Sequence, residues 1–354
     1  MGKKVKVAIA GIGNCASALI QGTRFYKDNH DAIGLVNYNL NGIEPKDIEF
    51  VAAFDVVETK VGKDLSEAIF SYPNNTIKIS DVEPLGVKVQ KGPVLDGIGR
   101  HMSKIVKISN EPQVNVSKIL KDTGAEILIN YLPVGSTNAT KYYAEQALEA
   151  NVAFINAIPV FIASNTKWQE AFADKNLPIA GDDVMSQLGA TILHKTIAKL
   201  LVDRGVVIDQ TYQLNIGGDT DFYNMLDEER LNDKRESKES AVRAMVPYNV
   251  PMRIGPSDYV PFLDNTKVCY IYLKGRYFGN IPLEINVKLE VIDAYNSAGV
   301  MIDAVRATKI ALDRGVKGPL ISVSAYCFKH PPKQMPYNEA KNAFIEFIEN
   351  KRER

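Results

Sequence analysis

The sequence predicts an α/β protein: a Rossmann-like doubly wound parallel sheet, with a second α+β domain built on a mixed or antiparallel sheet. Three observations predict this fold class. A short apolar strand enters a glycine turn near the N-terminus, continuous apolar segments alternate with helical ones to about residue 185, and later strands alternate polar with apolar residues. Continuous apolar strands between helices are typical of a parallel sheet, whereas alternation indicates half-buried strands.

The N-terminal segment carries a dinucleotide-binding pattern. An apolar strand is expected over residues 5–10, and Gly11, Gly13 and Ala16 follow it at the spacing G-x-G-x-x-A. Gly11 permits the tight turn, Gly13 lets the backbone approach a pyrophosphate, and Ala16 allows close packing of helix on strand. The helix expected over residues 16–21 would direct its free N–H groups at the phosphates. A bare structural turn is the alternative interpretation.

A second apolar strand, residues 50–54, ends in Asp55. At this place in a dinucleotide-binding unit an acid accepts hydrogen bonds from the ribose hydroxyls and repels a 2′-phosphate, which favours NAD over NADP. Alternatively, Asp55 begins a turn or caps a helix near residues 63–70. Asp55 lies later than the usual distance of about 20 residues from the glycines, so we expect residues 23–47 to be an insertion.

The rest of the chain divides into three predicted parts. Further buried strands are expected at residues 127–131, 153–156 and 178–180, with a helix at 138–149. After a helix at 190–204, alternating strands are expected at residues 211–216, 268–273 and 283–289, followed by helices at 298–314 and 338–354. Residues 319–321 resemble another β/α unit, so the chain should return to the first domain. We therefore predict a nucleotide-binding domain at 1–190, a second domain at 191–308, and a return to the first domain at 309–354.

Composition excludes several classes of function. The 354 residues include 42 basic and 42 acidic side chains, so net charge gives no argument for binding nucleic acid or an anionic membrane. No apolar run approaches the length of about 20 residues that spans a membrane. The three cysteines, Cys15, Cys269 and Cys327, lack C-x-x-C spacing and suggest neither a disulfide framework nor a thiolate zinc site. These features indicate a cytoplasmic protein.

Two lysines, Lys234 and Lys238, are four residues apart and would share one face of a helix. Repulsion between two ammonium groups lowers the pKa of one, so that it can act as a base while the other binds an oxyanion. The alternative is a solvated charged helix, in which Arg235, Glu236 and Glu239 are the partners. Spacing alone leaves both interpretations open.

Two loops carry polar side chains at strand ends. Gly181-Asp182-Asp183 follows a buried strand, and Ser186 precedes the next helix. Asp183 would hold a metal or a substrate hydroxyl, and Ser186 with neighbouring N–H groups would receive a phosphate. A simple capping acid is the alternative. The segment at residues 217–222 is either a plain turn or a ligand loop.

The residues described above, together with further motifs, resemble the prokaryotic branch of the myo-inositol-1-phosphate synthase (inositol-3-phosphate synthase) family over nearly the full length. The motifs that carry the resemblance are Gly11-Ile12-Gly13-Asn14-Cys15-Ala16-Ser17, Val51-Ala52-Ala53-Phe54-Asp55, Tyr131-Leu132-Pro133-Val134-Gly135-Ser136, Gly181-Asp182-Asp183, Ser237-Lys238 and Asn296-Ser297-Ala298-Gly299-Val300. The resemblance implies a redox-neutral cyclisation of glucose 6-phosphate with bound NAD. In that reaction C5 is oxidised, C6 enolises and attacks C1, and the ketone is reduced again.

The resemblance also implies roles for individual residues. The implied catalytic residues are Lys234, Lys238, Lys267, Lys329, Asp183 and Asp293, with Lys333 close enough to compete with Lys329. The implied cofactor-binding residues are Gly11, Gly13, Asn14, Cys15, Ala16, Asp55, Pro133, Gly135, Ser136, Asp183 and Ser186. Asp183 and Asp293 are also the implied ligands of a divalent or monovalent cation. The chain departs from the family pattern at Met185, where lysine is usual, and at Asp219, where asparagine is usual.

The chain is also expected to form an oligomer, and two other functions are possible alternatives. The resemblance implies a homotetramer, with the mixed sheet of the second domain at the subunit contacts. An NAD(P)-dependent dehydrogenase of a polyol phosphate or aldehyde is the enzyme alternative. A nucleotide-sensing or scaffold protein that kept the fold without turnover is the non-enzymatic alternative.

Overall fold

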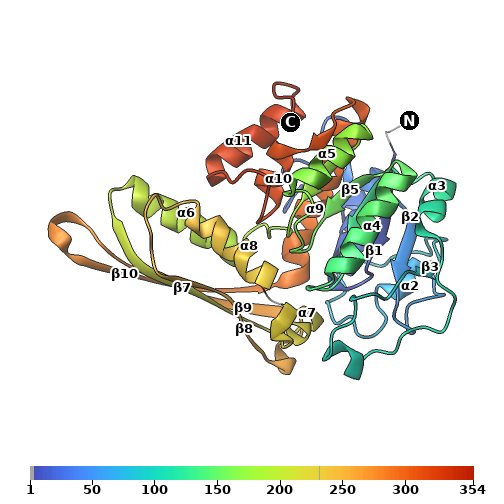
Figure 1. The fold of residues 1–354 in the computed structure, drawn as a ribbon, viewed down its shortest axis with the longest axis horizontal. Helices are drawn as coiled ribbons and strands as arrows, with labels where there is room; N and C mark the ends of the chain where they lie inside the picture. The colour runs from blue at the N-terminus through green and yellow to red at the C-terminus, as the bar shows by residue number, and fades with distance from the viewer. Residues whose placement is uncertain (1–3, 231) are drawn as a thin grey trace.

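The computed structural model describes residues 4–230 and 232–354. Its larger layer is a seven-stranded parallel sheet (Figure 1). The strands are β1 Val5–Ala10, β2 Ile48–Asp55, β3 Val89–Lys91, β4 Ile127–Asn130, β5 Ala153–Asn156, β6 Pro178–Gly181 and β11 Gly318–Pro319. They lie in the order β3-β2-β1-β4-β5-β6-β11, and each neighbouring pair is parallel. An order of 3-2-1-4-5-6 is that of the Rossmann fold, so the predicted fold class is confirmed.

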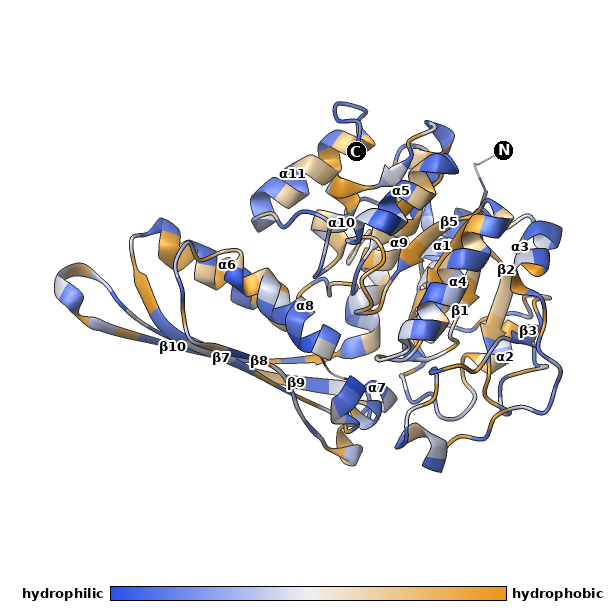
Figure 2. Cartoon of the chain, viewed as in Figure 1, coloured by the Kyte–Doolittle hydropathy of each residue, from blue (hydrophilic) through white to orange (hydrophobic). Residues whose placement is uncertain are grey.

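Helices cover both faces of this sheet. On one face α1 Asn14–Asp28, α9 Asp293–Asp313, α10 Ile321–Cys327 and α11 Tyr337–Ile348 contribute to one hydrophobic core. On the other, α3 Val116–Thr123, α4 Thr137–Ala150 and α5 Thr166–Asp174 contribute to a second. From Val7 to Ala10, successive β1 residues alternate between these cores, as expected for a strand covered on both faces. Figure 2 accordingly shows mostly hydrophobic strands between the helices.

Helix α1 is longer than predicted. The inserted segment that follows it is hydrogen-bonded to α9. The side chain of Arg306 in α9 is fully buried. Its guanidinium donates to the carbonyl oxygens of Tyr38 at 2.7 Å, Asn37 at 2.8 Å and Ile43 at 3.2 Å. A buried guanidinium needs such acceptors, so Arg306 fixes the path of the insertion.

The short helix α2, Leu65–Ala68, is capped by Asp64, whose Oδ1 accepts the Ser66 N–H at 2.9 Å. The alternative in which Asp55 caps this helix is therefore wrong, because Asp64, the residue directly before the helix, supplies the cap. The remaining short elements are α7 Thr220–Asn224 and the 3₁₀ helices Pro45–Asp47, Met102–Lys104, Glu228–Arg230, Pro261–Leu263 and Phe278–Asn280.

The second sheet is mixed. Its strands are β7 Val207–Gly217, β8 Met252–Tyr259, β9 Thr266–Arg276 and β10 Pro282–Ile292 in the order β10-β9-β7-β8. Strands β7 and β8 are parallel, and the other two pairs are antiparallel. Helices α6 Ala190–Asp203 and α8 Asn232–Arg243 lie on one face (Figure 1). Side chains that alternate with the buried ones, among them Tyr212, Leu214 and Tyr270, are exposed.

Strand β10 leads into α9 without an intervening loop, and α9 returns the chain to the larger sheet. This helix begins five residues before the predicted position 298, and the last helix ends at Ile348 rather than at Arg354. The predicted three-part division at residues 190 and 308 stays a prediction. Among the residues that the structure describes, no helix is long and apolar enough to cross a membrane.

Candidate active site

The glycine turn after β1 is shaped by close contact on one side and by open space on the other. Gly11 has a φ of +91°, and a Cβ at this position would lie 2.5 Å from the carbonyl oxygen of Tyr131. A Cβ at Gly13 would meet nothing within 4 Å. Gly13 precedes α1, and no side chain caps the helix. The N–H groups of the first turn are therefore available to an anion in that open space.

Gly11→Ala is expected to weaken NAD binding by about tenfold or more, because the new methyl group would push the turn away from β4. Isothermal titration with NAD measures the effect. Gly62→Ala is the matched control, because Gly62 has the same φ of +91° but the nearest contact of its Cβ, with the Lys88 side chain, is at 3.8 Å. Equal NAD affinity in the two variants would contradict the steric argument.

The side chain of Asp55 is hydrogen-bonded to the backbone of this turn. Its Oδ2 accepts the Ile12 N–H at 2.8 Å, and its Oδ1 accepts the N–H groups of Val56 at 2.7 Å and Val57 at 2.9 Å. The carboxylate is buried. Asp55 therefore organises the glycine turn, and a ribose hydroxyl would have to share an oxygen that already accepts a backbone N–H.

The side chain of Asn14 joins the turn to a neighbouring loop. Its Nδ2 donates to Asn75 Oδ1 at 2.8 Å, and its Oδ1 accepts the N–H groups of Asn75 at 2.9 Å and Thr76 at 3.2 Å. Thr76 in turn donates to Asn265 Oδ1 at 3.3 Å, and Asn265 adjoins the strand that carries Lys267. The turn is thus connected by hydrogen bonds to the second sheet.

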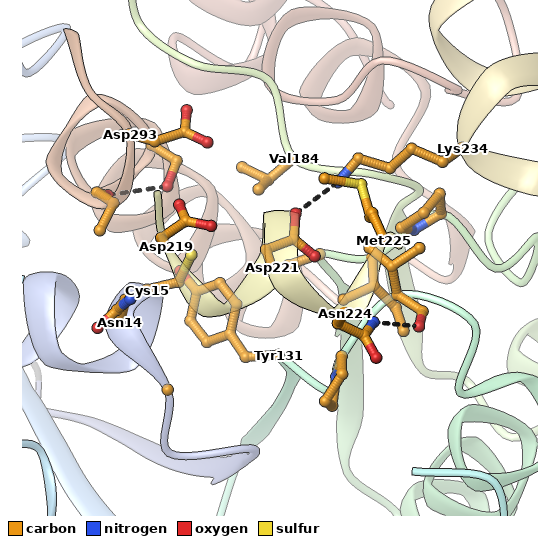
Figure 3. Close-up of a pocket in the computed structure, with 18 of the residues that line it drawn as sticks. Asn14, Cys15, Tyr131, Val184, Asp219, Asp221, Asn224, Met225, Lys234 and Asp293 are labelled. Carbon is orange, nitrogen blue, oxygen red and sulfur yellow. Dashed lines mark hydrogen bonds and ion pairs between the residues drawn. The ribbon is translucent and has the colours of Figure 1, made fainter. Parts of the chain in front are cut away.

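A cavity lies between the glycine turn and the second sheet (Figure 3). The predicted site residues that line it are Gly13, Asn14, Cys15, Pro133, Asp183, Ser186, Lys234, Lys238, Lys267, Asp293 and Lys329. Within the described part of the chain, the residues that line it do not include Gly11, Ala16, Asp55, Gly135 and Ser136. Lys329 lines the cavity, whereas its predicted competitor Lys333 is exposed. Residues widely separated in sequence therefore meet here.

Gly135 and Ser136 lie against the side chain of Arg230 instead. A Cβ at Gly135 would lie 2.6 Å from the side chain of Arg230, which donates to Val134 O at 2.9 Å. A further Arg230 nitrogen lies 3.4 Å from Ser136 Oγ. The loop that follows β4 is therefore held by a cation from the segment that precedes α8.

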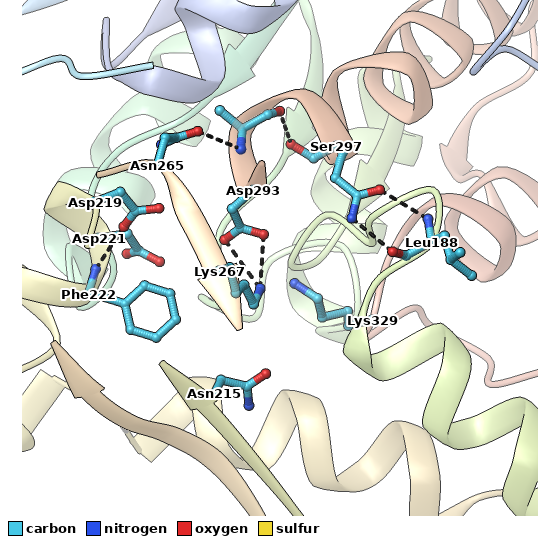
Figure 4. A network of polar contacts seen from close by, with 12 residues as sticks. Leu188, Asn215, Asp219, Asp221, Phe222, Asn265, Lys267, Asp293, Ser297 and Lys329 are labelled. Atoms are coloured by element: carbon cyan, nitrogen blue, oxygen red, sulfur yellow. Dashed lines mark hydrogen bonds and ion pairs between the residues drawn. The ribbon is translucent and has the colours of Figure 1, made fainter. Parts of the chain in front are cut away.

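Three of the four predicted lysines form ion pairs. Lys234 Nζ lies 3.0 Å from Asp221 Oδ2, Lys267 Nζ lies 2.9 Å from Asp293 Oδ1, and Lys329 Nζ lies 2.9 Å from Asp183 Oδ1. Figure 4 shows the Lys267–Asp293 pair with Lys329 beside it. Burial alone would lower the pKa of Lys234, but Asp221 and Asp183 outweigh it and raise that pKa. Asp221 lies in α7, within the segment at residues 217–222 for which the sequence left a plain turn open.

Lys238 differs from the other three. Its side chain is buried, and among the described residues no carboxylate forms an ion pair with it. Burial, reinforced by the charges of Lys267, Lys234 and Lys329, lowers the pKa of Lys238 well below its ordinary value. The solvated-helix alternative is therefore wrong, because α8 turns both Lys234 and Lys238 into the protein interior. A lysine whose pKa is lowered in this way is the member of the cluster best suited to accept a proton.

The two adjacent acids after β6 have separate tasks. Burial alone would raise the pKa of Asp183, but Lys329 and Lys234 outweigh it and lower that pKa to about 2. Its Oδ2 also accepts the Ser237 hydroxyl at 2.7 Å. Asp182 instead accepts the N–H groups of the loop at residues 162–164 and is fully buried. Asp183 therefore belongs to the site, while Asp182 is structural.

A smaller pocket adjoins the lysines at the start of α6. Its wall consists of Met185, Ser186, Gly189, Ala190, Thr191, Ile192, Asn215, Lys238, Lys267 and Lys329. Gly189 precedes α6, and no side chain caps this helix. Free N–H groups of a helix N-terminus beside lysines favour a phosphate. Met185 lies in the wall without supplying charge. The sequence indicated this helix N-terminus through Ser186, whereas no motif indicated Asn215.

Asp219 stands among other acids at the edge of the main cavity (Figures 3 and 4). Its Oδ1 accepts the Phe222 N–H at 3.0 Å and so caps α7. Burial, with the negative charges of Asp293 and Asp221, raises the pKa of Asp219 to about 7. Within the described ranges, no group of three or more His, Cys, Asp or Glu side chains is arranged to hold a metal ion. Asp183 and Asp293 each bind a lysine.

Fold and site together define a Rossmann-fold enzyme with a buried cluster of lysines and aspartates beside its nucleotide-binding turn. Residues 189–294 match the model of the myo-inositol-1-phosphate synthase family. The chain is 50% identical to inositol-3-phosphate synthase of Mycolicibacterium smegmatis over 98% of both chains, and 51% identical to that of Mycobacterium tuberculosis over 98% of this chain and 96% of the relative. The chain belongs to the myo-inositol-1-phosphate synthase family, and the predicted resemblance is confirmed.

The fold is shared with solved structures as well. A myo-inositol-1-phosphate synthase-related protein from Thermotoga maritima superposes with a TM-score of 0.83 at 26% identity, and the match covers 98% of each chain. The similarity includes both sheets, because it extends over almost the whole chain.

Proposed function

We propose that this protein converts D-glucose 6-phosphate into 1L-myo-inositol 1-phosphate by a redox-neutral cyclisation that depends on NAD. The observation that carries the proposal is the convergence of four lysines, two buried and two partly buried, on a cavity that the glycine turn also borders. Relatives at about half identity bear the name inositol-3-phosphate synthase. A phosphate pocket at α6 and a nucleotide turn at α1 are the two anion sites that such a reaction requires.

The residues at the glycine turn fit a dinucleotide. Gly13 leaves room for a pyrophosphate, and the first turn of α1 offers N–H groups without a competing cap. When bound, NAD supplies the hydride acceptor for oxidation at C5 and the hydride donor for the final reduction. We assign its contacts to the predicted residues that border the cavity: Gly13, Asn14, Cys15, Pro133, Asp183 and Ser186.

The lysines divide the proton and charge chemistry between them. Once C5 is a ketone, its neighbour C6 is acidic, and the neutral amine of Lys238 takes the proton from C6. Lys234 and Lys267, whose carboxylate partners raise their pKa values, stay charged and stabilise the negative oxygens of the enolate and of the aldol step that joins C6 to C1. Burial lowers the pKa of Lys329, and its ion pair with Asp183 opposes that effect. The start of α6 holds the substrate phosphate.

Stoichiometry tests the proposed reaction. Incubation of the purified protein with glucose 6-phosphate and a small fraction of one equivalent of NAD should give many equivalents of inositol phosphate with no net NADH, since the same hydride is removed and returned. Product is measured by chromatography and NADH by absorbance. Steady accumulation of NADH would favour the dehydrogenase alternative, and no turnover with NAD binding intact would favour a nucleotide-sensing protein.

We further propose that the chain works as a cytoplasmic homotetramer. The exposed face of the second sheet, with Tyr212, Leu214 and Tyr270, supports a subunit contact there. A divalent or monovalent cation at Asp183 and Asp293 stays part of the proposal, and the ion would have to compete with Lys329 and Lys267 for those carboxylates.

A further inference from the structure

Lys60 lies beneath the glycine turn, outside the cluster of catalytic lysines. Its side chain is 3% exposed. Its Nζ donates to the carbonyl oxygen of Ile12 at 2.7 Å and to Asn74 Oδ1 at 2.9 Å, and it lies 3.9 Å from Asp55 Oδ2. No step of the proposed reaction uses this ammonium group.

The peptide groups on either side of Ile12 are held by these neighbours. The Ile12 N–H donates to Asp55 at 2.8 Å, while the Ile12 carbonyl accepts from Lys60 and, at 3.1 Å, from Asn74 Nδ2. Ile12 stands between Gly11 and Gly13, which leave the backbone free to rotate unless other groups fix it. The direction of the carbonyl also sets the direction of the next N–H group, that of Gly13, because both belong to one planar peptide.

Burying the ammonium group of Lys60 costs free energy, and its contacts show which groups offset that cost. Burial lowers the pKa of Lys60, and the negative charge of Asp55 opposes that effect. A buried cation is retained when hydrogen bonds and an opposite charge satisfy it. Here the acceptors are the turn itself, through Ile12, and the loop at Asn74. The charged contacts of Lys60 thus all serve the conformation of the glycine turn and its surroundings.

We propose that Lys60 is a positioning residue for the cofactor, which fixes the Ile12 carbonyl and thereby presets the glycine turn to receive a pyrophosphate. The inference rests on the proposed NAD-dependent function. Asp55 acts with it from the N–H side of Ile12. Because Lys60 Nζ lies near Asp55, its positive charge also offsets the negative charge of the buried Asp55 carboxylate.

Lys60→Met tests the proposal, because methionine fills a similar volume without donating a hydrogen bond. The Kd for NAD, measured by isothermal titration, should rise by about tenfold or more, since charged hydrogen bonds are the strong ones. In steady-state kinetics the KM for NAD should rise similarly, with kcat at saturating NAD and the KM for glucose 6-phosphate little changed. Lys63→Met is the matched control, because Lys63 is exposed and donates only to Ser71.

Several outcomes would overturn the proposal. A Kd for NAD in Lys60→Met equal to that of Lys63→Met, with both variants folded by thermal melting, would remove it. If Lys60→Met does not fold, Asn74→Ala decides, because it removes the other donor to Ile12 and one acceptor of Lys60. An unchanged Kd for NAD in that variant would also overturn the proposal. If the unaltered protein does not bind NAD, the proposed function itself fails, which is a distinguishable result.

Discussion

Lys238→Met should lower kcat by about 10³-fold while the Kd for NAD stays nearly constant, since a general base contributes about 10²- to 10⁴-fold. Lys238 is the one lysine of the four at the site that forms no ion pair with a described carboxylate, and its pKa is lowered well below its ordinary value by burial and by three neighbouring lysines. Methionine keeps the length of the side chain and removes the amine. Inositol phosphate production measures kcat, and isothermal titration measures the Kd.

Lys288→Met is the control for this experiment, because Lys288 is an exposed lysine of β10 that pairs with Glu290. The pH profile adds an independent measurement. Only the unprotonated amine of Lys238 takes a proton, so kcat/KM of the unaltered protein should fall as the pH drops through the lowered pKa of Lys238. The residual activity of Lys238→Met should lack this limb. Unchanged kcat in Lys238→Met would remove the proposed enolisation step.

Asp183→Asn is expected to destabilise the fold by about 3–5 kcal/mol, the usual cost of removing one partner of a buried ion pair. The variant leaves the Lys329 ammonium buried without its carboxylate and alters the acceptor of the Ser237 hydroxyl. Turnover should also fall strongly, because the cluster loses the charge that orients Lys329. Urea unfolding gives the free energy, and the product assay gives turnover. Asp209→Asn, which removes a half-exposed partner of Arg276, should change both quantities little.

The stability difference should depend on pH. The pKa of Asp183 is lowered to about 2 from an ordinary value of 3.8. A lowered carboxyl pKa contributes stability that is present above the unfolded pKa and is lost as the pH falls through the folded one. The gap between the unaltered protein and Asp183→Asn should therefore be constant near neutrality and shrink as the pH falls from about 4 toward 2. A gap that persists at low pH would contradict the ion pair.

The strands of the larger sheet could be predicted because their signal is local. The glycine turn and the uninterrupted apolar segments place β1, β2, β4, β5 and β6 close to where the structure has them. Strand β8 has no such signal, since it contains Gly255 and Pro256 and several exposed residues. It lies at the edge of the second sheet, where proline is tolerated because one side of the strand needs no partner.

The site could be predicted less completely than the sheet from local sequence patterns. The spacing of Lys234 and Lys238 indicates one helix face, but only their tertiary partners decide whether that face is solvated. Asp183 lies in the loop after β6, distant from α8 in sequence, and Asp221 lies in a separate helix, α7, so no helical periodicity links them to Lys234. Similarly, the contact of Lys60 with Ile12 spans 48 residues. The family motifs identified the four lysines that we propose as catalytic, whereas the groups that shift their pKa values could be identified only from the fold.

The direct continuation of β10 into α9 has a mechanical consequence. Asp293, the first residue of the helix, forms an ion pair with Lys267 in the second sheet, while Val300 and later residues of the same helix pack in the core of the larger sheet. No loop separates strand from helix, so this connection lacks the residues at which a hinge usually bends. At this connection the cofactor half and the lysine half of the enzyme are therefore joined by one continuous strand and helix, with Asp293 at the point where they meet.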